Sequence, residues 1–146
     1  MRDRISRRRQ KQSRGAVLIE TGLILIAFMF MLMGAFDFAQ FFFVHQAIVD
    51  RARTAARWGA VTDPTNASAI QNMVLYNQST VPDGSTSGIF GLTSAMVTAS
   101  TTGSGTDDYR LIVTIANYPL QMISPIIGGS YMGAYIRISI PLGLTS

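Results

Sequence analysis

The sequence predicts an α+β protein in which one long N-terminal helix, first transmembrane and then amphipathic, packs on a small antiparallel sheet. Residues 1–63 contain no proline and space their apolar residues as a helix does. Residues 109–118 and 134–142 alternate between apolar and polar side chains, which is typical of strands. With 146 residues, the chain has room for one domain and an anchor, but not for two full domains.

The N-terminal residues form a basic segment. Seven of the twelve Lys and Arg residues lie in the first fourteen positions, whereas the chain from Ala16 onward has five basic and seven acidic residues. A basic head can bind nucleic acid, but an apolar segment follows this one at once. Because Lys and Arg beside a membrane span keep that end in the cytoplasm, we expect a cytoplasmic N-terminus and no nucleic-acid partner. The basic residues are Arg2, Arg4, Arg7, Arg8, Arg9, Lys11 and Arg14.

The next segment, residues 16–36, is predicted to be a transmembrane helix. It is an apolar run of 21 residues in which Glu20 is the only charged residue. At about 1.5 Å per residue, roughly 20 residues cross a hydrocarbon core of about 30 Å. A cleaved secretory signal is the alternative, but such a signal has a shorter apolar region and ends in small residues. Here the bulky sequence "DFAQFFF" follows instead.

The helix is expected to continue beyond the membrane as an amphipathic segment, residues 37–59. Apolar or small residues recur at heptad spacing, while the charged residues fall on other faces of the helix. One face should therefore pack against another part of the protein. The repeating residues are Phe38, Phe41, His45, Ile48, Ala52, Ala55 and Gly59.

Residues 60–146 are expected to form a small external α+β domain. Asp63 as a helix cap, followed by Pro64 in the first turn, predicts a short helix that ends near Asn77. A domain of this size has a small core, and packing on the long helix would supply the missing apolar surface.

The rest of this domain is predicted to consist of a loop and three antiparallel strands. The loop contains Pro, Asp, Gly and Ser residues, and two prolines bound an irregular connection before the last strand. Ile136, Ile138, Ile140 and Leu142 are expected to face inward from that strand. The predicted ranges are 79–88 for the loop, 95–101, 109–118 and 134–142 for the strands, and 119–130 for the connection.

No catalytic constellation is visible, so we expect no enzymatic activity, no metal site and no cofactor. The absence of cysteine excludes thiolate chemistry. The only histidine, His45, is expected to be a packing residue. Asp107 and Asp108 are expected to lie in a solvated turn, because the ligand spacing of an EF-hand is missing. Trp58 is expected in the core, with an anchor at the junction of helix and domain as the alternative.

Glu20 has two interpretations. A carboxylate in hydrocarbon is expensive, although the cost falls near the start of a span, where Glu20 could be an interfacial acid beside the basic residues. Alternatively, Glu20 pairs with a cation at membrane depth. A cut between Gly15 and Ala16 would create one, because Ala16 would gain a free α-amine four residues before Glu20 on the same helix.

These residues carry a resemblance to a known family. "RGAVLIE" resembles the class III leader of type IV pilin-like proteins, with a glycine before the cut and a glutamate as fifth residue of the mature chain. The helix that follows, ending in "RTAARWGAV", resembles that of the TadE-like pseudopilins, although it lacks a proline that many of them have after the glutamate. The likeness covers residues 15–62 and, more loosely, residues 109–142, but not residues 63–108.

The resemblance implies a pilin-like fold and a minor pilin of the tight-adherence (Flp) pilus system. In this interpretation residues 1–15 are a leader that a prepilin peptidase removes after Gly15, and Glu20 neutralises the α-amine of a neighbouring subunit. Arg7, Arg8, Arg9, Lys11 and Arg14 would hold the N-terminus on the cytoplasmic side of a bacterial inner membrane.

The implied partners are the membrane, the prepilin peptidase, other pilins or pseudopilins and the pilus assembly platform. The domain at residues 60–146 would be periplasmic or extracellular, with possible incorporation in the pilus. Three alternatives remain open: a major pilin, a secretion-system pseudopilin, and an uncleaved single-pass anchor that carries a small binding domain.

Overall fold

The computed structural model describes the backbone of residues 2–121 and 129–143, and the side chains of residues 15–121, 129 and 131–143. The chain divides into two compact units, Met1–Ala39 and Gln40–Ser146. The second of these is called the outer unit below.

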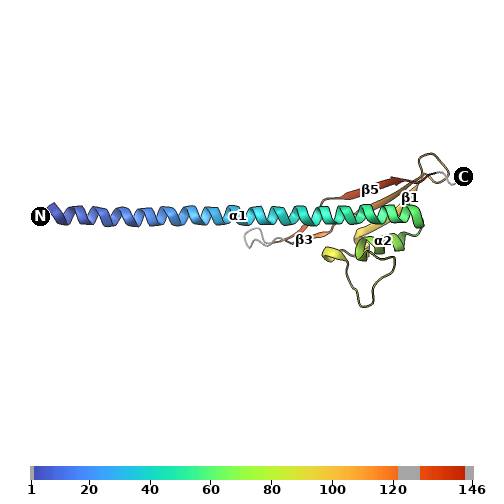
Figure 1. The fold of residues 1–146 in the computed structure, drawn as a ribbon, viewed down its shortest axis with the longest axis horizontal. Coiled ribbons are helices and arrows are strands. Elements are labelled where there is room, and N and C mark those ends of the chain that lie inside the picture. Colours follow the sequence, from blue (N-terminus) through green and yellow to red (C-terminus); the bar gives the residue numbers. More distant parts are fainter. Residues whose placement is uncertain (1, 122–128, 144–146) are drawn as a thin grey trace. The chain divides into compact units, whose positions relative to one another are not determined.

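One helix, α1 (Arg2–Thr62), runs through both units (Figure 1). Its 61 residues confirm the predicted continuous helix and extend it through the basic segment on one side and to Thr62 on the other. The absence of proline explains why the backbone hydrogen-bond ladder continues without a break.

The outer unit adds a second helix and two antiparallel sheets, which confirms the predicted α+β class. The larger sheet has the strand order β1-β2-β5 and the smaller one pairs β3 with β4. Two short 3-10 helices precede β1. The bounds are α2 (Ala67–Tyr76), η1 (Ile89–Gly91), η2 (Ser94–Met96), β1 (Val97–Thr102), β2 (Arg110–Ile115), β3 (Pro119–Gln121), β4 (Ser130–Met132) and β5 (Ile136–Pro141).

The three predicted strands are present, but the irregular connection predicted over 119–130 is partly wrong. Its described ends are strands β3 and β4, which pair Pro119 with Met132 and Gln121 with Ser130. Residues 122–128 of that connection lie outside the described residues. Strands of three residues are too short for an alternating pattern, and proline is tolerated as the first residue of a strand.

The inward rows of the larger sheet follow the predicted alternation, but Ile112 on the other face of β2 is also buried. Leu111, Val113 and Ile115 of β2, the central strand, are fully buried. In the edge strand β5 the inward row is less complete, because Ile138 and Ile140 are only partly buried.

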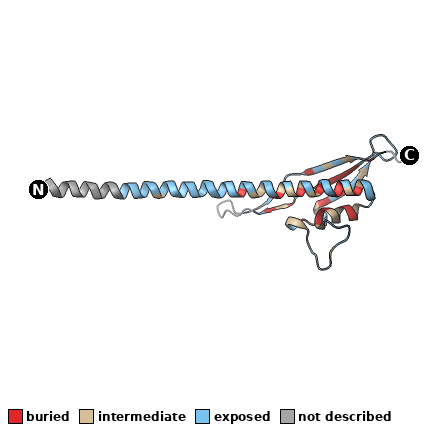
Figure 2. Cartoon of the chain, in the orientation of Figure 1, coloured by how far each residue is buried: buried red, intermediate tan, exposed pale blue. Residues whose placement is uncertain are grey.

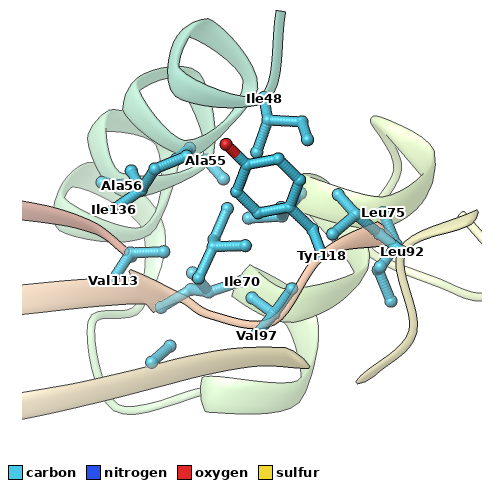
Figure 3. Packing of buried hydrophobic residues seen from close by; sticks show 14 of the residues in the cluster. Ile48, Ala55, Ala56, Ile70, Leu75, Leu92, Val97, Val113, Tyr118 and Ile136 are labelled. Atoms are coloured by element: carbon cyan, nitrogen blue, oxygen red, sulfur yellow. The ribbon is translucent and has the colours of Figure 1, made fainter. Parts of the chain in front are cut away.

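The core forms where the second half of α1 meets β1, β2 and α2. Ile48, Ala52, Ala55 and Ala56 are fully buried, so the predicted packing face of the amphipathic segment is confirmed (Figures 2 and 3). The buried stripe begins at Val44, whereas Phe38 is 65% exposed. Trp58 is partly buried against this core, as expected.

The N-terminal cap of α2 differs from the prediction. The helix begins at Ala67, and Asn66, not Asp63, is its cap, with Asn66 Oδ1 accepting a hydrogen bond of 3.1 Å from the amide of Ala69. Asp63 instead closes the turn after α1, where its Oδ1 accepts from the hydroxyl and the amide of Thr65. These bonds stabilise the carboxylate and lower the pKa of Asp63.

Candidate functional site

The candidate site is the stretch of α1 from Gly15 to Glu20. The helix is continuous through the Gly15–Ala16 bond, and every residue of this stretch is exposed. Ala16 and Glu20 are four residues apart, so they lie on one face of the helix about 6 Å apart along its axis. The structure therefore places Ala16 and Glu20 one helical turn apart on an exposed face of α1.

Gly15 has free space around it. A Cβ atom added at this position would meet no heavy atom within 4 Å, and the same is true of Gly22 and Gly34. The packing of this chain therefore does not require glycine at position 15. Helix stability does not favour glycine either, because glycine in a helix interior is less stable than alanine by about 1 kcal/mol.

The helix that follows the site exposes large apolar side chains on all sides. Between Val17 and Phe36, the exposed fractions of the large apolar side chains range from 40% for Leu32 to 76% for Met31 (Figure 2). The helix is long and apolar enough to cross a membrane, by length and composition. A helix that is apolar all round needs an apolar environment on every side, which a bilayer supplies.

The basic residues predicted to orient the chain all belong to α1. Arg7, Arg8, Arg9, Lys11 and Arg14 lie within its first turns, ahead of the apolar run. They directly precede the apolar run, as positively charged residues that flank a transmembrane segment do.

Asp37 stands at the other end of the apolar run. It is the only Asp, Glu, Lys or Arg between Thr21 and Val49, and its side chain is just 4% exposed. The burial of this acid was not predicted from the sequence.

His45 has a packing role that the sequence predicted only in general terms. Its ring stacks on Phe41, and its Nδ1 lies 2.6 Å from the hydroxyl oxygen of Tyr118, in a hydrogen bond that joins α1 to the segment before β3. Tyr118 is fully buried, and Figure 3 shows its ring beside Ile48 with the oxygen directed toward α1. Burial raises the pKa of the Tyr118 phenol, although a hydrogen bond from the amide of Ala134 opposes this shift.

A glycine makes the position of Tyr118 possible. A Cβ atom on Gly133 would lie 1.8 Å from the Tyr118 ring, and the amide of Gly133 donates to the Tyr118 carbonyl at 2.9 Å. The sequence signal for this contact is a glycine between Met132 and Ala134, but only the fold shows which ring it faces.

The acidic residues of the outer unit that could have suggested a metal site make structural contacts. Asp108 forms an ion pair with Arg110 in the exposed turn between β1 and β2, as expected of a solvated turn. Among residues that the structure describes, no group of three His, Cys, Asp or Glu side chains could hold a metal ion.

Comparison with known proteins gives one match. Residues 15–57 match the family model described as "TadE-like protein". Searches of curated proteins and of solved structures found no match. The matched range begins at Gly15 and includes Glu20, the apolar helix and the buried stripe, so the family likeness predicted from these residues is confirmed.

The match implies involvement in a tight-adherence pilus system and association with the membrane and with pilus assembly components. Among the described residues, one helix is long and apolar enough for a span, and together with the match it indicates a membrane-anchored, single-pass protein. This chain thus carries a TadE-like segment, residues 15–57, at its N-terminal end.

Proposed function

We propose that the chain is a minor pilin or pseudopilin that acts, without catalysis of its own, in assembly of a tight-adherence (Flp-type) pilus. A prepilin peptidase cuts it after Gly15. The observation that carries the proposal is the exposed helix face with Ala16 and Glu20 four residues apart, inside the segment that matches TadE-like protein.

The cut changes the charge at the start of the apolar helix. In the precursor, position 16 carries only a neutral peptide group, and Glu20 is an acid in an apolar stretch. In the mature chain the Ala16 α-amine is positive, and its charge lies one helical turn before Glu20, or about 6 Å along the axis. An ion pair between Glu20 and the amine of a neighbouring subunit offsets the cost of keeping both charges in the membrane. A helix without such a partner would carry the free-energy cost of its charges in the membrane uncompensated. The ion pair therefore favours side-by-side packing of helices, with Glu20 of one subunit next to Ala16 of another.

The remaining parts of the chain have matching roles in this proposal. Residues 1–15 are the leader, residues 16–36 cross the inner membrane, residues 37–59 continue the helix, and residues 60–146 form the domain outside. Arg7, Arg8, Arg9, Lys11 and Arg14 keep the leader in the cytoplasm, where the peptidase reaches it. The partners are the peptidase, other pilins or pseudopilins, and the assembly platform.

Cleavage is tested by the mature N-terminus and by a pair of glycine variants. We expect N-terminal mass spectrometry of protein from the native membrane to find Ala16 as the first residue. Gly15→Ala should abolish processing, whereas Gly22→Ala, which replaces an equally unobstructed glycine, should be processed normally. Full-length protein in the native membrane would support an uncleaved anchor instead, and normal processing of Gly15→Ala would contradict the role of Gly15 in the cut.

Charge pairing is tested separately by Glu20→Gln, which keeps the size of the side chain and removes its charge. We expect normal cleavage but a loss of pili by roughly tenfold or more, since a lost ion pair of about 1.4 kcal/mol is a factor of ten in an equilibrium. Thr21→Val is the matched control, because Thr21 is also exposed and its hydroxyl bonds only to the carbonyl of Val17, at 2.8 Å. Pilus counts by electron microscopy that are equal for both variants contradict the pairing role.

A further inference from the structure

Several apolar side chains of the outer unit lie next to one another near the start of that unit. The rings of Phe43 and Phe90 meet edge to face, with centroids 6.1 Å apart. Next to Phe90, Gly91 lies close enough to Pro119 that an added Cβ atom would be 3.4 Å from its Cγ. Pro119 in turn pairs with Met132 across β3 and β4, which puts both side chains on one face. Phe43, Phe90, Pro119 and Met132 are called the aromatic edge below.

Large side chains of the aromatic edge are turned outward. Phe43 is 66% exposed and Met132 is 75% exposed. Phe90 has a φ of 54°, a left-handed conformation that is unusual and strained for a bulky residue. The backbone therefore holds this ring against Phe43 at an energetic cost, although neither ring is part of the fully buried core.

The segments that carry the aromatic edge lack formal charge. No Asp, Glu, Lys or Arg occurs in residues 38–49, 88–96, 118–121 or 129–135. The other end of the sheet is different, because the turn between β1 and β2 contains Asp107 and Asp108 and is followed by Arg110. Near the uncharged end, the amide of Ala116 donates a hydrogen bond to the carbonyl of Met96. The charged and uncharged ends of the sheet are separated by the length of its strands, about 20 Å.

The helix between the apolar run and the aromatic edge is only a few ångströms longer than the headgroup region of a membrane is thick. Phe43 follows Phe36, the last residue of the run, by seven residues, or about 10 Å of helix. The polar headgroup region adds about 5–8 Å on each side of the hydrocarbon core, and helices tilt by about 20° on average. Aromatic side chains at a span end commonly occupy this region.

From exposure, absence of charge and distance along the chain, we propose that the aromatic edge lies in the headgroup region of the same membrane that α1 crosses. The partner of this surface is therefore a lipid bilayer. The contact would fix the depth and the orientation of the outer unit on the membrane. This inference rests on the membrane anchoring in the proposed function, but not on cleavage or pilus assembly.

The test uses the lack of cysteine in this chain, which allows a fluorophore to be attached at one introduced thiol. The full chain is reconstituted in vesicles of phosphatidylethanolamine and phosphatidylglycerol, some with a spin label on the headgroup and some with one deep in the acyl chain. The probe is placed by Met132→Cys in the aromatic edge, by Ser104→Cys in the distant turn and by Leu25→Cys in the span. Phe43 and Phe90 are retained in all three variants.

We expect headgroup spin labels to quench the Met132 probe at least about twofold more than the Ser104 probe. The deep label should quench only the Leu25 probe. In the Met132→Cys background, Phe43→Ser with Phe90→Ser should reduce the quenching at Met132, because the surface then loses its apolar contacts with the interface.

Three results would overturn the proposal. Equal quenching at Met132 and Ser104 means that the aromatic edge is in water. A Met132 probe that becomes protected only at high protein density, without lipid quenching, means that the surface binds another copy of the chain. Absence of quenching at Leu25 means that the chain is not inserted, which contradicts the membrane anchoring as well.

Discussion

Two stretches of one helix, residues 16–36 and residues 40–62, show how the same backbone serves two different environments. The first has large apolar side chains in every direction, and the side chains between Val17 and Phe36 are almost all exposed. The second has one buried stripe, in which isoleucine gives way to alanine and glycine toward the end of the helix. A helix with a single apolar stripe packs on protein, whereas one that is apolar all round is suited to lipid.

The difference also concerns side-chain size. Ala52, Ala55, Ala56 and Gly59 are buried, which allows the backbone of α1 to approach α2 and β2 closely. Small residues are unnecessary in the first stretch, where lipid chains adapt to the side chains that they meet. The two stretches should therefore respond in opposite ways to the same substitution.

The largest effect is expected from truncating one isoleucine in each stretch. Ile48→Ala removes a fully buried side chain and should lower the free energy of unfolding by about 2–5 kcal/mol. Ile26→Ala removes a side chain that is 57% exposed and should leave the stability of the outer unit within about 0.5 kcal/mol. Denaturant unfolding of the full chain in detergent can be followed through Trp58, the only tryptophan, which packs against the core of the outer unit. Equal losses in the two variants would contradict the division of α1 into these stretches.

A smaller effect is expected when a methyl group is added instead of removed. At Gly59 a Cβ atom would lie 2.7 Å from two side-chain carbons of Ile70, so Gly59→Ala must displace that side chain. Overpacking costs about 1–3 kcal/mol, from which the better helix propensity of alanine recovers about 1 kcal/mol. Gly34→Ala, where no heavy atom lies within 4 Å, is the matched control and should not destabilise the outer unit. The unfolding midpoint from Trp58 fluorescence distinguishes the variants, and a midpoint that rises in Gly59→Ala as it does in Gly34→Ala would contradict close packing at this point.

The same contrast explains how much of the structure the sequence could predict. Periodicity over many residues predicted α1, its buried stripe and strands β1, β2 and β5, because burial on one face requires a regular pattern. The cap of α2 was misassigned, since Asp63 and Asn66 are both good cap residues and the fold decides between them. Strands β3 and β4 have three residues each and therefore have no readable period.

The functional features show the same difference between local sequence patterns and contacts that depend on the fold. Gly15, Ala16 and Glu20 are close together in the chain and form a local motif, so the sequence alone could propose them as a site. The bond between His45 and Tyr118 joins residues 73 positions apart, and neither residue's neighbours indicate the other. The aromatic edge likewise combines four separate segments, none of which is a motif by itself.

The smallest effect is expected at the bond between His45 and Tyr118, which lies in the outer unit near the start of the buried stripe. Tyr118→Phe removes the hydroxyl that lies 2.6 Å from His45 Nδ1, and should cost about 0.5–1.5 kcal/mol at neutral pH. His45 is partly buried, so the lost bond is only partly replaced by water. The loss should therefore be smaller than that of Ile48→Ala.

The pH dependence separates this bond from simple packing. Burial raises the pKa of Tyr118 above its ordinary value of 10.0, so the unfolded chain loses the phenolic proton at a lower pH than the folded chain does. The stability that this group contributes is thus complete below about pH 10 and is lost as the pH rises through the folded pKa. We expect the wild-type chain to lose stability in alkaline solution more steeply than Tyr118→Phe, so that the two converge. Unfolding followed through Trp58 from neutral pH to about pH 11 tests this, and parallel curves would mean that the Tyr118 hydroxyl is as exposed to water as in the unfolded chain.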